Sequence, residues 1–279
     1  MKSLNLILFI LVTAINGLAQ KSQVIKDSIY SENLDRHIRY NIYLPMAYDK
    51  QSSFPIVYLL HGHGGNEDDW IEAQEGNAQY LLDSLIDKGL IPNILAVTLD
   101  AQNTWYVDSK EKMQSAYLEE FIPLIENRYK VKSDRASRMI AGNSAGGFGS
   151  LGFALRFPEL FHSVILLSPA SYYPAPPPNS SSRKIPVFKK NNQLDTALWQ
   201  SFAYPSLVSG ISDINYPDFY ISTGDDDEYQ IVTVVTDLQK FFIKNEIEQE
   251  LTIINGGHTW DVWRNRFCYD LVRIFQRRR

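Results

Sequence analysis

A serine flanked by glycines is the first feature of this sequence that could do chemistry. Gly142-Asn143-Ser144-Ala145-Gly146 has the pattern G-x-S-x-G. In this pattern a sharp turn from a strand into a helix holds the serine hydroxyl clear of the backbone, and a side chain at either glycine would collide with the neighbouring strand or helix. An apolar run precedes the motif and a helix-like run follows it, so Ser144 is predicted to be a nucleophile.

Two later loops offer a base and an acid for such a nucleophile. His258 follows the last expected strand, in Gly256-Gly257-His258. Gly224-Asp225-Asp226-Asp227-Glu228 follows an earlier one and offers a carboxylate that could orient the imidazole. The spacing Gly-x-x-Asp favours Asp227, with Asp226 second and Asp225 third. The predicted triad is therefore Ser144, Asp227 and His258, with the choice of acid left open.

A glycine-rich turn earlier in the chain supplies a third component. His61-Gly62-His63-Gly64-Gly65 directly follows the apolar run at 56–60. Such a turn can direct backbone N–H groups toward a tetrahedral oxyanion, with a second N–H from the residue after the nucleophile. We assign these two donors to His63 and Ala145.

The remaining histidines have structural explanations. His37 is expected at the surface, His162 in a structural hydrogen bond, and His61 in holding the shape of its turn. A zinc site built from His61, His63 and the acidic run is the alternative. It is not favoured, because each of these residues already has a role, and we expect neither a metal nor an organic cofactor.

Short apolar runs alternate with longer amphipathic stretches along the chain, which is typical of an α/β fold with a mostly parallel sheet flanked by helices. The first strand is expected at an edge of the sheet, because it alternates and stops at Pro45. Strands are expected at 39–44, 56–60, 94–99, 138–141, 164–167, 219–222 and 251–254. Helices are expected at 75–88, 112–129, 148–157, 230–244 and 263–276.

Residues 171–210 depart from this alternation. They hold six of the 13 prolines and the aromatic residues Tyr172, Tyr173, Trp199, Phe202 and Tyr204. A loop of this length in a compact domain is either functional or disordered. The segment is predicted to be either a loose surface insertion or a lid over the active site.

The N-terminus has the pattern of an export signal. Lys2 supplies a positive charge, residues 4–15 are mostly apolar, and Gly17-Leu18-Ala19 provides small residues for cleavage. The apolar run is shorter than the roughly 20 residues of a spanning helix. Residues 1–19 are therefore predicted to be a signal peptide of a secreted or periplasmic protein. No cysteine follows Ala19 that could carry a lipid, and residues 20–279 are expected to form one domain.

Charge and cysteine content exclude several other classes. The net charge is −5, and it becomes −6 when Lys2 is lost with the signal. No basic surface for nucleic acid is expected, since Arg277-Arg278-Arg279 reads as a solvated tail. Cys268 is the single cysteine, so an internal disulfide is impossible, and its apolar helical context predicts a buried core thiol.

Taken together, the motifs resemble those of the esterase D/feruloyl esterase-like branch of the α/β-hydrolases, which includes tributyrin and enterochelin esterases and mycolyltransferases. The order nucleophile, acid, histidine is the α/β-hydrolase order. The resemblance implies an α/β-hydrolase fold and a serine carboxylesterase without a cofactor, with oxyanion donors at His63 and Ala145. Asn143 and Ala145 depart from the residues that often flank the serine in relatives, which affects the lining of the pocket more than the mechanism. The matching segments are 40–45 (YNIYLP), 57–65 (VYLLHGHGG), 105–106 (WY), 138–147 (RMIAGNSAGG), 157–161 (FPELF) and 257–260 (GHTW).

The expected substrate is a small-molecule or polysaccharide ester. Export and the resemblance both favour acetyl or feruloyl groups on plant polysaccharide, and Trp105, Tyr106 and Trp260 are candidate substrate contacts. The signal peptide disfavours a cytosolic S-formylglutathione hydrolase. An acyltransferase with a sugar acceptor and a non-catalytic carbohydrate-binding relative are the alternatives. The sequence does not specify an oligomeric state.

Overall fold

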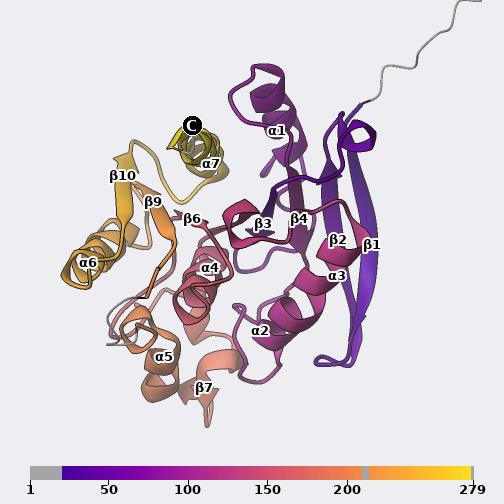
Figure 1. Ribbon diagram of the computed structural model, residues 1–279. Coiled ribbons are helices and arrows are strands. Elements are labelled where there is room, and N and C mark those ends of the chain that lie inside the picture. Colours follow the sequence, from indigo (N-terminus) through magenta and orange to yellow (C-terminus); the bar gives the residue numbers. More distant parts are fainter. Residues whose placement is uncertain (1–20, 209–213, 278–279) are drawn as a thin grey trace, which may run out of the picture.

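A single eight-stranded sheet forms the centre of the protein (Figure 1). The computed structural model describes residues 21–208 and 214–277, so the predicted signal peptide lies outside the described residues. The strand order is β1-β2-β4-β3-β5-β6-β9-β10. β2 pairs antiparallel with both β1 and β4, whereas all other neighbours are parallel. This is the mostly parallel α/β sheet that the alternation of apolar runs predicts.

The elements follow one another in the expected order. The strands are β1 Gln23–Ser31, β2 Arg36–Leu44, β3 Ile56–Leu60, β4 Leu95–Leu99, β5 Arg138–Asn143, β6 Ser163–Leu167, β7 Lys189–Lys190, β8 Gln193–Leu194, β9 Asp218–Gly224 and β10 Gln249–Ile254. The helices are α1 Ala78–Asp87, α2 Met113–Ser115, α3 Ile122–Arg128, α4 Ala145–Arg156, α5 Thr196–Phe202, α6 Ile231–Lys244 and α7 Trp260–Arg277. A π-helical segment, Ala116–Phe121, joins α2 to α3.

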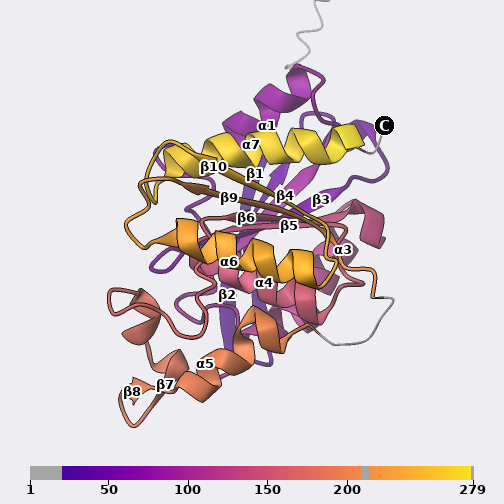
Figure 2. The ribbon, with the colours of Figure 1, turned by 90° about the vertical axis from the view of Figure 1, so that its left-hand side faces the viewer.

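Helices cover both faces of the sheet. Figure 2 shows α1 and α7 on one side of the strands and α4 and α6 on the other. The side chains of β3 alternate between two apolar clusters, with Tyr58 and Leu60 in the cluster that contains α4 and α6, and Val57 and Leu59 in the cluster that contains α1 and α7. A strand buried on both faces needs an apolar residue at every position, which explains the continuous run at 56–60.

The first strand was predicted wrongly. The structure places β1 at the edge of the sheet and β2 inside it, paired on both sides. β1 was missed because most of its residues are exposed or partly exposed, with only Ile29 and Ser31 buried. An edge strand with one face toward solvent lacks the apolar run that marks the central strands.

Two helices begin earlier than their apolar periodicity indicates. α4 begins at Ala145, directly after Ser144, and α7 begins at Trp260. Glycines lie in the first turn of α4 and shortly before α7, so the sequence near these two starts carries little of the periodic apolar signal. Ser144 directly precedes α4 and His258 lies two residues before α7, so the starts of these helices help to place both side chains.

The parallel strands bring distant segments to one edge of the sheet. β3, β5, β6, β9 and β10 point in the same direction, so the loops at their carboxyl ends meet there. The glycine turn follows β3, Ser144 follows β5, the acidic loop follows β9, and His258 follows β10. This is the edge at which open α/β sheets bind their ligands.

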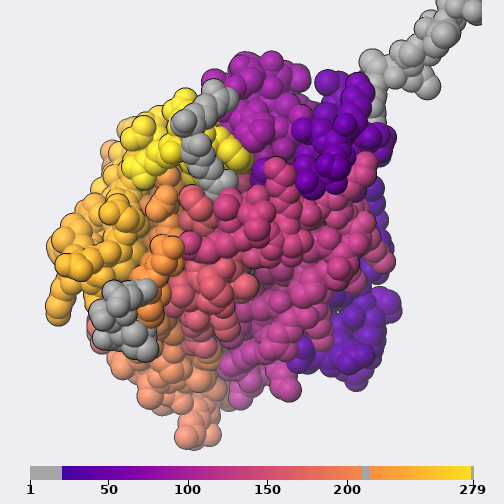
Figure 3. Space-filling view, viewed as in Figure 1, coloured from indigo at the N-terminus to yellow at the C-terminus, as the bar shows by residue number. Residues whose placement is uncertain are grey.

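The segment that follows β6 packs onto the rest of the chain in its described part, 171–208. Trp199 on α5 stacks on Phe148 of α4 at 5.1 Å between ring centroids, and its indole N–H donates to the carbonyl of Tyr172 (3.0 Å). Figure 3 shows the segment, in salmon and orange, as part of the continuous surface at the lower end of the molecule. The described part of the segment is thus packed, and action as a lid stays a prediction.

Within the described ranges, every helix is too short or too polar to cross a lipid bilayer.

Two glycines of the serine motif are expected to tolerate no side chain. A Cβ at Gly146 would lie 2.2 Å from the carbonyl oxygen of Leu60, and one at Gly142 would lie 2.3 Å from Gly146. We expect Gly146→Ala to lower the free energy of unfolding by roughly 2–4 kcal/mol, because β3 and α4 must move apart. Urea unfolding followed by circular dichroism measures this change.

Gly152, on the same helix, provides the control, because a Cβ there meets nothing within 4 Å. Gly152→Ala is expected to raise the free energy of unfolding by up to about 1 kcal/mol, from the higher helix propensity of alanine. Equal stability of Gly146→Ala and Gly152→Ala would contradict the close approach of β3 to α4.

Candidate active site

Ser144 lies in a tight turn between β5 and α4. Its backbone adopts φ 53° and ψ −114°, a region that L-residues rarely occupy. The end of β6 and the loop after it hold it there, since its N–H donates to the carbonyl of Leu167 (2.9 Å) and its carbonyl accepts from the N–H of Ala170 (3.0 Å). The side chain is thereby presented at the carboxyl edge of the sheet.

His258 and Asp227 are hydrogen-bonded to each other. His258 Nδ1 lies 2.7 Å from Asp227 Oδ2, and the Asp227 side chain is fully buried. The other carboxylate oxygen accepts from the backbone N–H of Tyr229 (3.0 Å). Asp225 and Asp226 are exposed, and Asp225 instead accepts a hydrogen bond from the N–H of Gly256 (2.9 Å). Of the three candidate acids, the structure brings Asp227 to the histidine.

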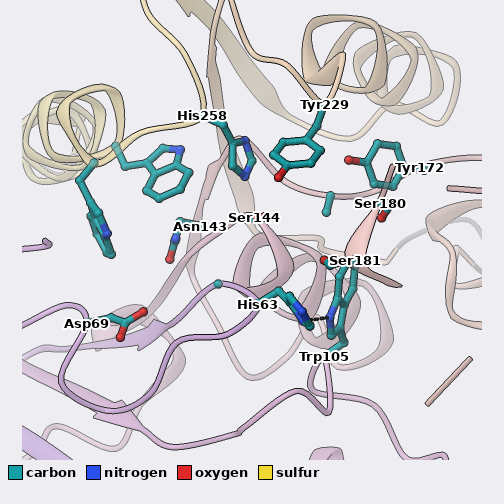
Figure 4. Close-up of a pocket in the computed structure, with 14 residues that line it drawn as sticks. His63, Asp69, Trp105, Asn143, Ser144, Tyr172, Ser180, Ser181, Tyr229 and His258 are labelled. Carbon is teal, nitrogen blue, oxygen red and sulfur yellow. Dashed lines mark hydrogen bonds between the residues drawn. The ribbon is translucent and has the colours of Figure 1, made fainter. Parts of the chain in front are cut away.

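Two aromatic rings hold the His258 imidazole in place. Tyr229 and Trp263 contact it edge-on, at 4.8 Å and 4.9 Å between centroids. Trp263 is itself fixed, because its indole N–H donates to the Ser168 hydroxyl (3.1 Å). With Nδ1–H directed to the carboxylate, the imidazole keeps Nε2 free to accept a proton. His258 and Ser144 line the same pocket (Figure 4).

His61 holds the glycine turn, as its position predicts. Its Nδ1 lies 2.7 Å from the carbonyl of Gly62, and its Nε2 accepts from the N–H of Ala101 (3.1 Å). Burial lowers the pKa of His61, so the ring is neutral and donates from Nδ1. This bridge joins the turn after β3 to the loop after β4.

The turn brings backbone close to Ser144. A Cβ at Gly62 would lie 3.0 Å from Asn143 Nδ2, which is a tight contact, and 3.6 Å from the Ser144 Cβ. Ala145 is the first residue of α4, and its N–H therefore has no acceptor within the helix. In residues 21–208 and 214–277, the N–H of His63 is likewise without an acceptor, whereas the next N–H, that of Gly64, donates to Asn103 (2.8 Å).

The His63 side chain is fixed by Trp105. The indole N–H donates to His63 Nδ1 at 3.4 Å, a contact that Figure 4 shows as a dashed line. Burial, with a smaller contribution from the positive charge of Lys184, lowers the pKa of His63. The ring is therefore neutral and carries its proton on Nε2.

These residues surround a pocket of about 220 Å³. In Figure 4, Asn143 and Asp69 lie on one side of His258, and Tyr229, Tyr172 and Ser180 lie on the other. The side-chain oxygen of Asn143 is buried and has no hydrogen-bond partner among the residues that the structure describes. The lining residues are Gly62, His63, Asp69, Trp105, Asn143, Ser144, Ala170, Tyr172, Ser180, Ser181, Tyr229, His258, Trp260 and Trp263.

Of the three predicted substrate contacts, the structure brings Trp105 and Trp260 to the pocket but not Tyr106. The Tyr106 ring is buried against Gly149 of α4, and its hydroxyl donates to the carbonyl of His61 (3.1 Å). Adjacent residues of an irregular loop can point in opposite directions, so the pair Trp105-Tyr106 could not be separated from the sequence. Tyr106 supports the glycine turn from behind.

Sequence reasoning missed several lining residues. Tyr229 follows Asp227 by two positions, and this proximity was the available signal. Ser180 and Ser181 belong to the proline-rich segment, whose path onto the pocket no local pattern indicates. Asp69 reaches the pocket from the loop between β3 and α1. These side chains are assembled by tertiary packing alone.

The single cysteine and the metal-ligating residue types could in principle provide other chemistry. Cys268 on α7 is partly exposed rather than fully buried as predicted, and burial still raises its pKa to about 11. At neutral pH such a thiol is protonated and a poor nucleophile. Across the two described ranges, no three His, Cys, Asp or Glu residues are arranged as metal ligands.

Comparison with known proteins identifies the family. The profile of the Esterase family, described as "Putative esterase", matches residues 31–274, which is most of the chain. The chain belongs to this family. Its structure also resembles a solved ferulic acid esterase (TM-score 0.78, 24% identity, covering 92% of this chain and 98% of that one). The S-formylglutathione hydrolase of Agrobacterium tumefaciens is similar too (TM-score 0.75, 21% identity, 93% and 96% covered). The α/β-hydrolase fold is thereby confirmed.

Two curated proteins are similar to this esterase-family chain in sequence. An endo-1,4-beta-xylanase/feruloyl esterase of Xylanibacter ruminicola is 33% identical over 53% of this chain, but the alignment spans only 22% of that longer protein. An acetyl esterase of Caldicellulosiruptor saccharolyticus is 26% identical over 74% of this chain and 78% of its own length. The predicted family is confirmed.

Proposed function

We propose that the protein is a serine carboxylesterase that acts through an acyl-enzyme on Ser144. The hydrogen bond between His258 and the buried carboxylate of Asp227, in the pocket that also holds Ser144, is the observation that carries this proposal. A buried carboxylate orients the imidazole and stabilises the imidazolium that forms when the serine loses its proton. Membership of the esterase family supports the same chemistry.

The reaction begins with proton transfer. His258 Nε2 takes the Ser144 hydroxyl proton as the oxygen attacks the ester carbonyl, and a C–O bond forms while the carbonyl becomes an oxyanion. The tetrahedral intermediate collapses, and the leaving alcohol takes the proton from His258. Water then attacks the acyl-enzyme by the same route and releases the acid.

The backbone N–H groups of His63 and Ala145 are the proposed oxyanion donors. Both groups are free of acceptors in residues 21–208 and 214–277, and both flank the nucleophile. Donors fixed before the reaction stabilise the developing charge without reorganising, and each contributes on the order of 10²–10³ in rate.

We propose acetyl or feruloyl esters of plant polysaccharide as the substrates. The names of the two relatives, an acetyl esterase and a xylanase/feruloyl esterase, support this choice. The aromatic side chains around the pocket, among them Trp105, Tyr172 and Trp260, could contact the apolar face of a sugar or a cinnamoyl ring. Export directed by residues 1–19 would bring the enzyme to such substrates. N-terminal sequencing of the secreted protein tests the cleavage after Ala19.

Labelling and a substrate panel test the proposal. A fluorophosphonate probe should label Ser144, and acetylated xylan, methyl ferulate and p-nitrophenyl esters should show which acyl group is released. Absence of both labelling and hydrolysis would favour a binding protein over an enzyme. Adding xylo-oligosaccharide and measuring the partition of acyl product between water and sugar separates a hydrolase from an acyltransferase.

A further inference from the structure

A second pocket lies beside the active site. Its volume is about 170 Å³, more than ten times the space that one water molecule requires. Tyr172 and Tyr229 line both pockets, so the two cavities are neighbours. Figure 4 shows these two tyrosines side by side at the edge of the active-site pocket. Residues 171–177, Tyr204 and the start of α6 form its remaining walls.

One polar group in this pocket has no protein partner. The Ser171 hydroxyl is buried, with 2% of the residue exposed, and it makes no hydrogen bond among the described residues. Leaving a buried hydroxyl unpaired is costly, and a ligand hydroxyl placed there would recover the bond. Ser171 therefore brings to the lining a hydroxyl that the described part of the chain leaves unpaired.

The other lining residues favour a neutral ring with hydroxyl groups. Four of them are tyrosines, and Tyr173, which is half exposed, contacts the buried ring of Tyr204 at 6.0 Å between centroids. Among the described residues that line the pocket, Asp237 is the only charged one, so an anionic ligand would be repelled. Tyrosine rings offer apolar faces together with hydroxyl groups, which suits the two kinds of surface on a sugar.

We propose that this tyrosine-lined pocket is a subsite for a sugar ring of the molecule whose ester is attacked by Ser144. The inference rests on the proposed esterase function and adds to it a place for the carbohydrate part of the substrate. The ester lies in the pocket with Ser144 and His258, and the neighbouring sugar lies beyond Tyr172 and Tyr229. The subsite raises kcat/KM for sugar esters without contributing to esters that lack a sugar.

The test compares an ester with a sugar against one without it. The measured quantity is kcat/KM for acetylated xylobiose divided by kcat/KM for p-nitrophenyl acetate, and feruloylated xylobiose with methyl ferulate is the second pair. Thr233 lines the pocket on the exposed face of α6, so Thr233→Trp fills the cavity with little risk to the fold. We expect this variant to lower the ratio by about tenfold, and Ser171→Ala to lower it about threefold to tenfold.

Ile243 provides the matched control. It lies on the same helix, is 63% exposed and does not line the pocket, so Ile243→Trp should leave the ratio unchanged. A ratio that stays constant in Thr233→Trp would overturn the subsite, and so would an equal loss on both substrates.

Failure of the esterase proposal would be distinguishable from failure of the subsite. If the unmodified protein hydrolyses no ester, the proposed function fails, and saturation-transfer NMR with xylobiose then decides the subsite alone. Binding that is lost in Thr233→Trp and kept in Ile243→Trp supports a sugar subsite. Absence of any xylobiose signal in the unmodified protein overturns it.

Discussion

Ser144→Ala is expected to lower kcat for ester hydrolysis by on the order of 10⁵-fold, because the residual rate then depends only on oxyanion stabilisation and binding. The substitution removes one oxygen and leaves the turn intact, since alanine meets the same backbone restriction at φ 53° as serine does. Initial rates on p-nitrophenyl acetate, measured with each protein at saturating substrate, provide the comparison.

The control for this variant is Ser133→Ala, at an exposed position before β5. It should retain full activity, and both variants should unfold at the temperature of the unmodified protein. Hydrolysis by Ser144→Ala at the unmodified rate would show that another group is the nucleophile. Loss of activity with a lowered melting temperature would instead point to a defect of folding, and fluorophosphonate labelling of the unmodified protein followed by peptide mapping would then identify the nucleophile directly.

Asp227→Asn is expected to lower kcat by roughly 10³–10⁴-fold. The asparagine amide can donate to His258 Nδ1, which now donates to the carboxylate at 2.7 Å. The imidazole would then carry its proton on Nε2 and could no longer accept the proton of Ser144. The side chains are nearly equal in size, so the geometry of the buried site should be kept. Stopped assays over long times measure the small residual rate.

Asp226→Asn is the matched control, because Asp226 is the neighbouring carboxylate and is exposed. Its rate should stay within about twofold of the unmodified protein, as is usual for surface substitutions. The opposite pattern, with Asp226→Asn inactive and Asp227→Asn active, would reassign the acid. Asp225→Asn completes the series, because the asparagine oxygen can still accept the hydrogen bond that Asp225 accepts from Gly256 (2.9 Å) while the charge is removed.

The central strands could be predicted because a strand that is buried on both faces carries apolar residues at successive positions in its sequence. β3 is apolar throughout, β6 is apolar after its first residue, Ser163, and both strands are covered by helices on both faces. β1 could not be recognised in the same way, since its pairing with β2 is made by backbone groups, and its side chains are mostly exposed. Backbone pairing leaves little trace in the choice of side chains.

The positions of Ser144 and of the glycine turn after β3 were predictable because their requirements are local. The turn needs glycines where β3 and α4 approach each other, and the distances at Gly142 and Gly146 show that constraint. The acid is a different case, because three consecutive carboxylates satisfy the same local pattern. Only burial against His258 separates Asp227 from Asp225 and Asp226, and that burial depends on how the loops after β9 and β10 pack together.

The sequence by itself therefore determined the α/β class, and it singled out Ser144, His258 and the glycine turn for the proposed chemistry, because each is encoded in residues that are neighbours along the chain. Tertiary structure alone decided which carboxylate meets the histidine, which of Trp105 and Tyr106 faces the pocket, and how Tyr172 and Tyr229 come to line two cavities. These outcomes depend on contacts between segments far apart in sequence. The direction of a side chain in a loop is set by the surface against which it packs, and no local pattern records that surface.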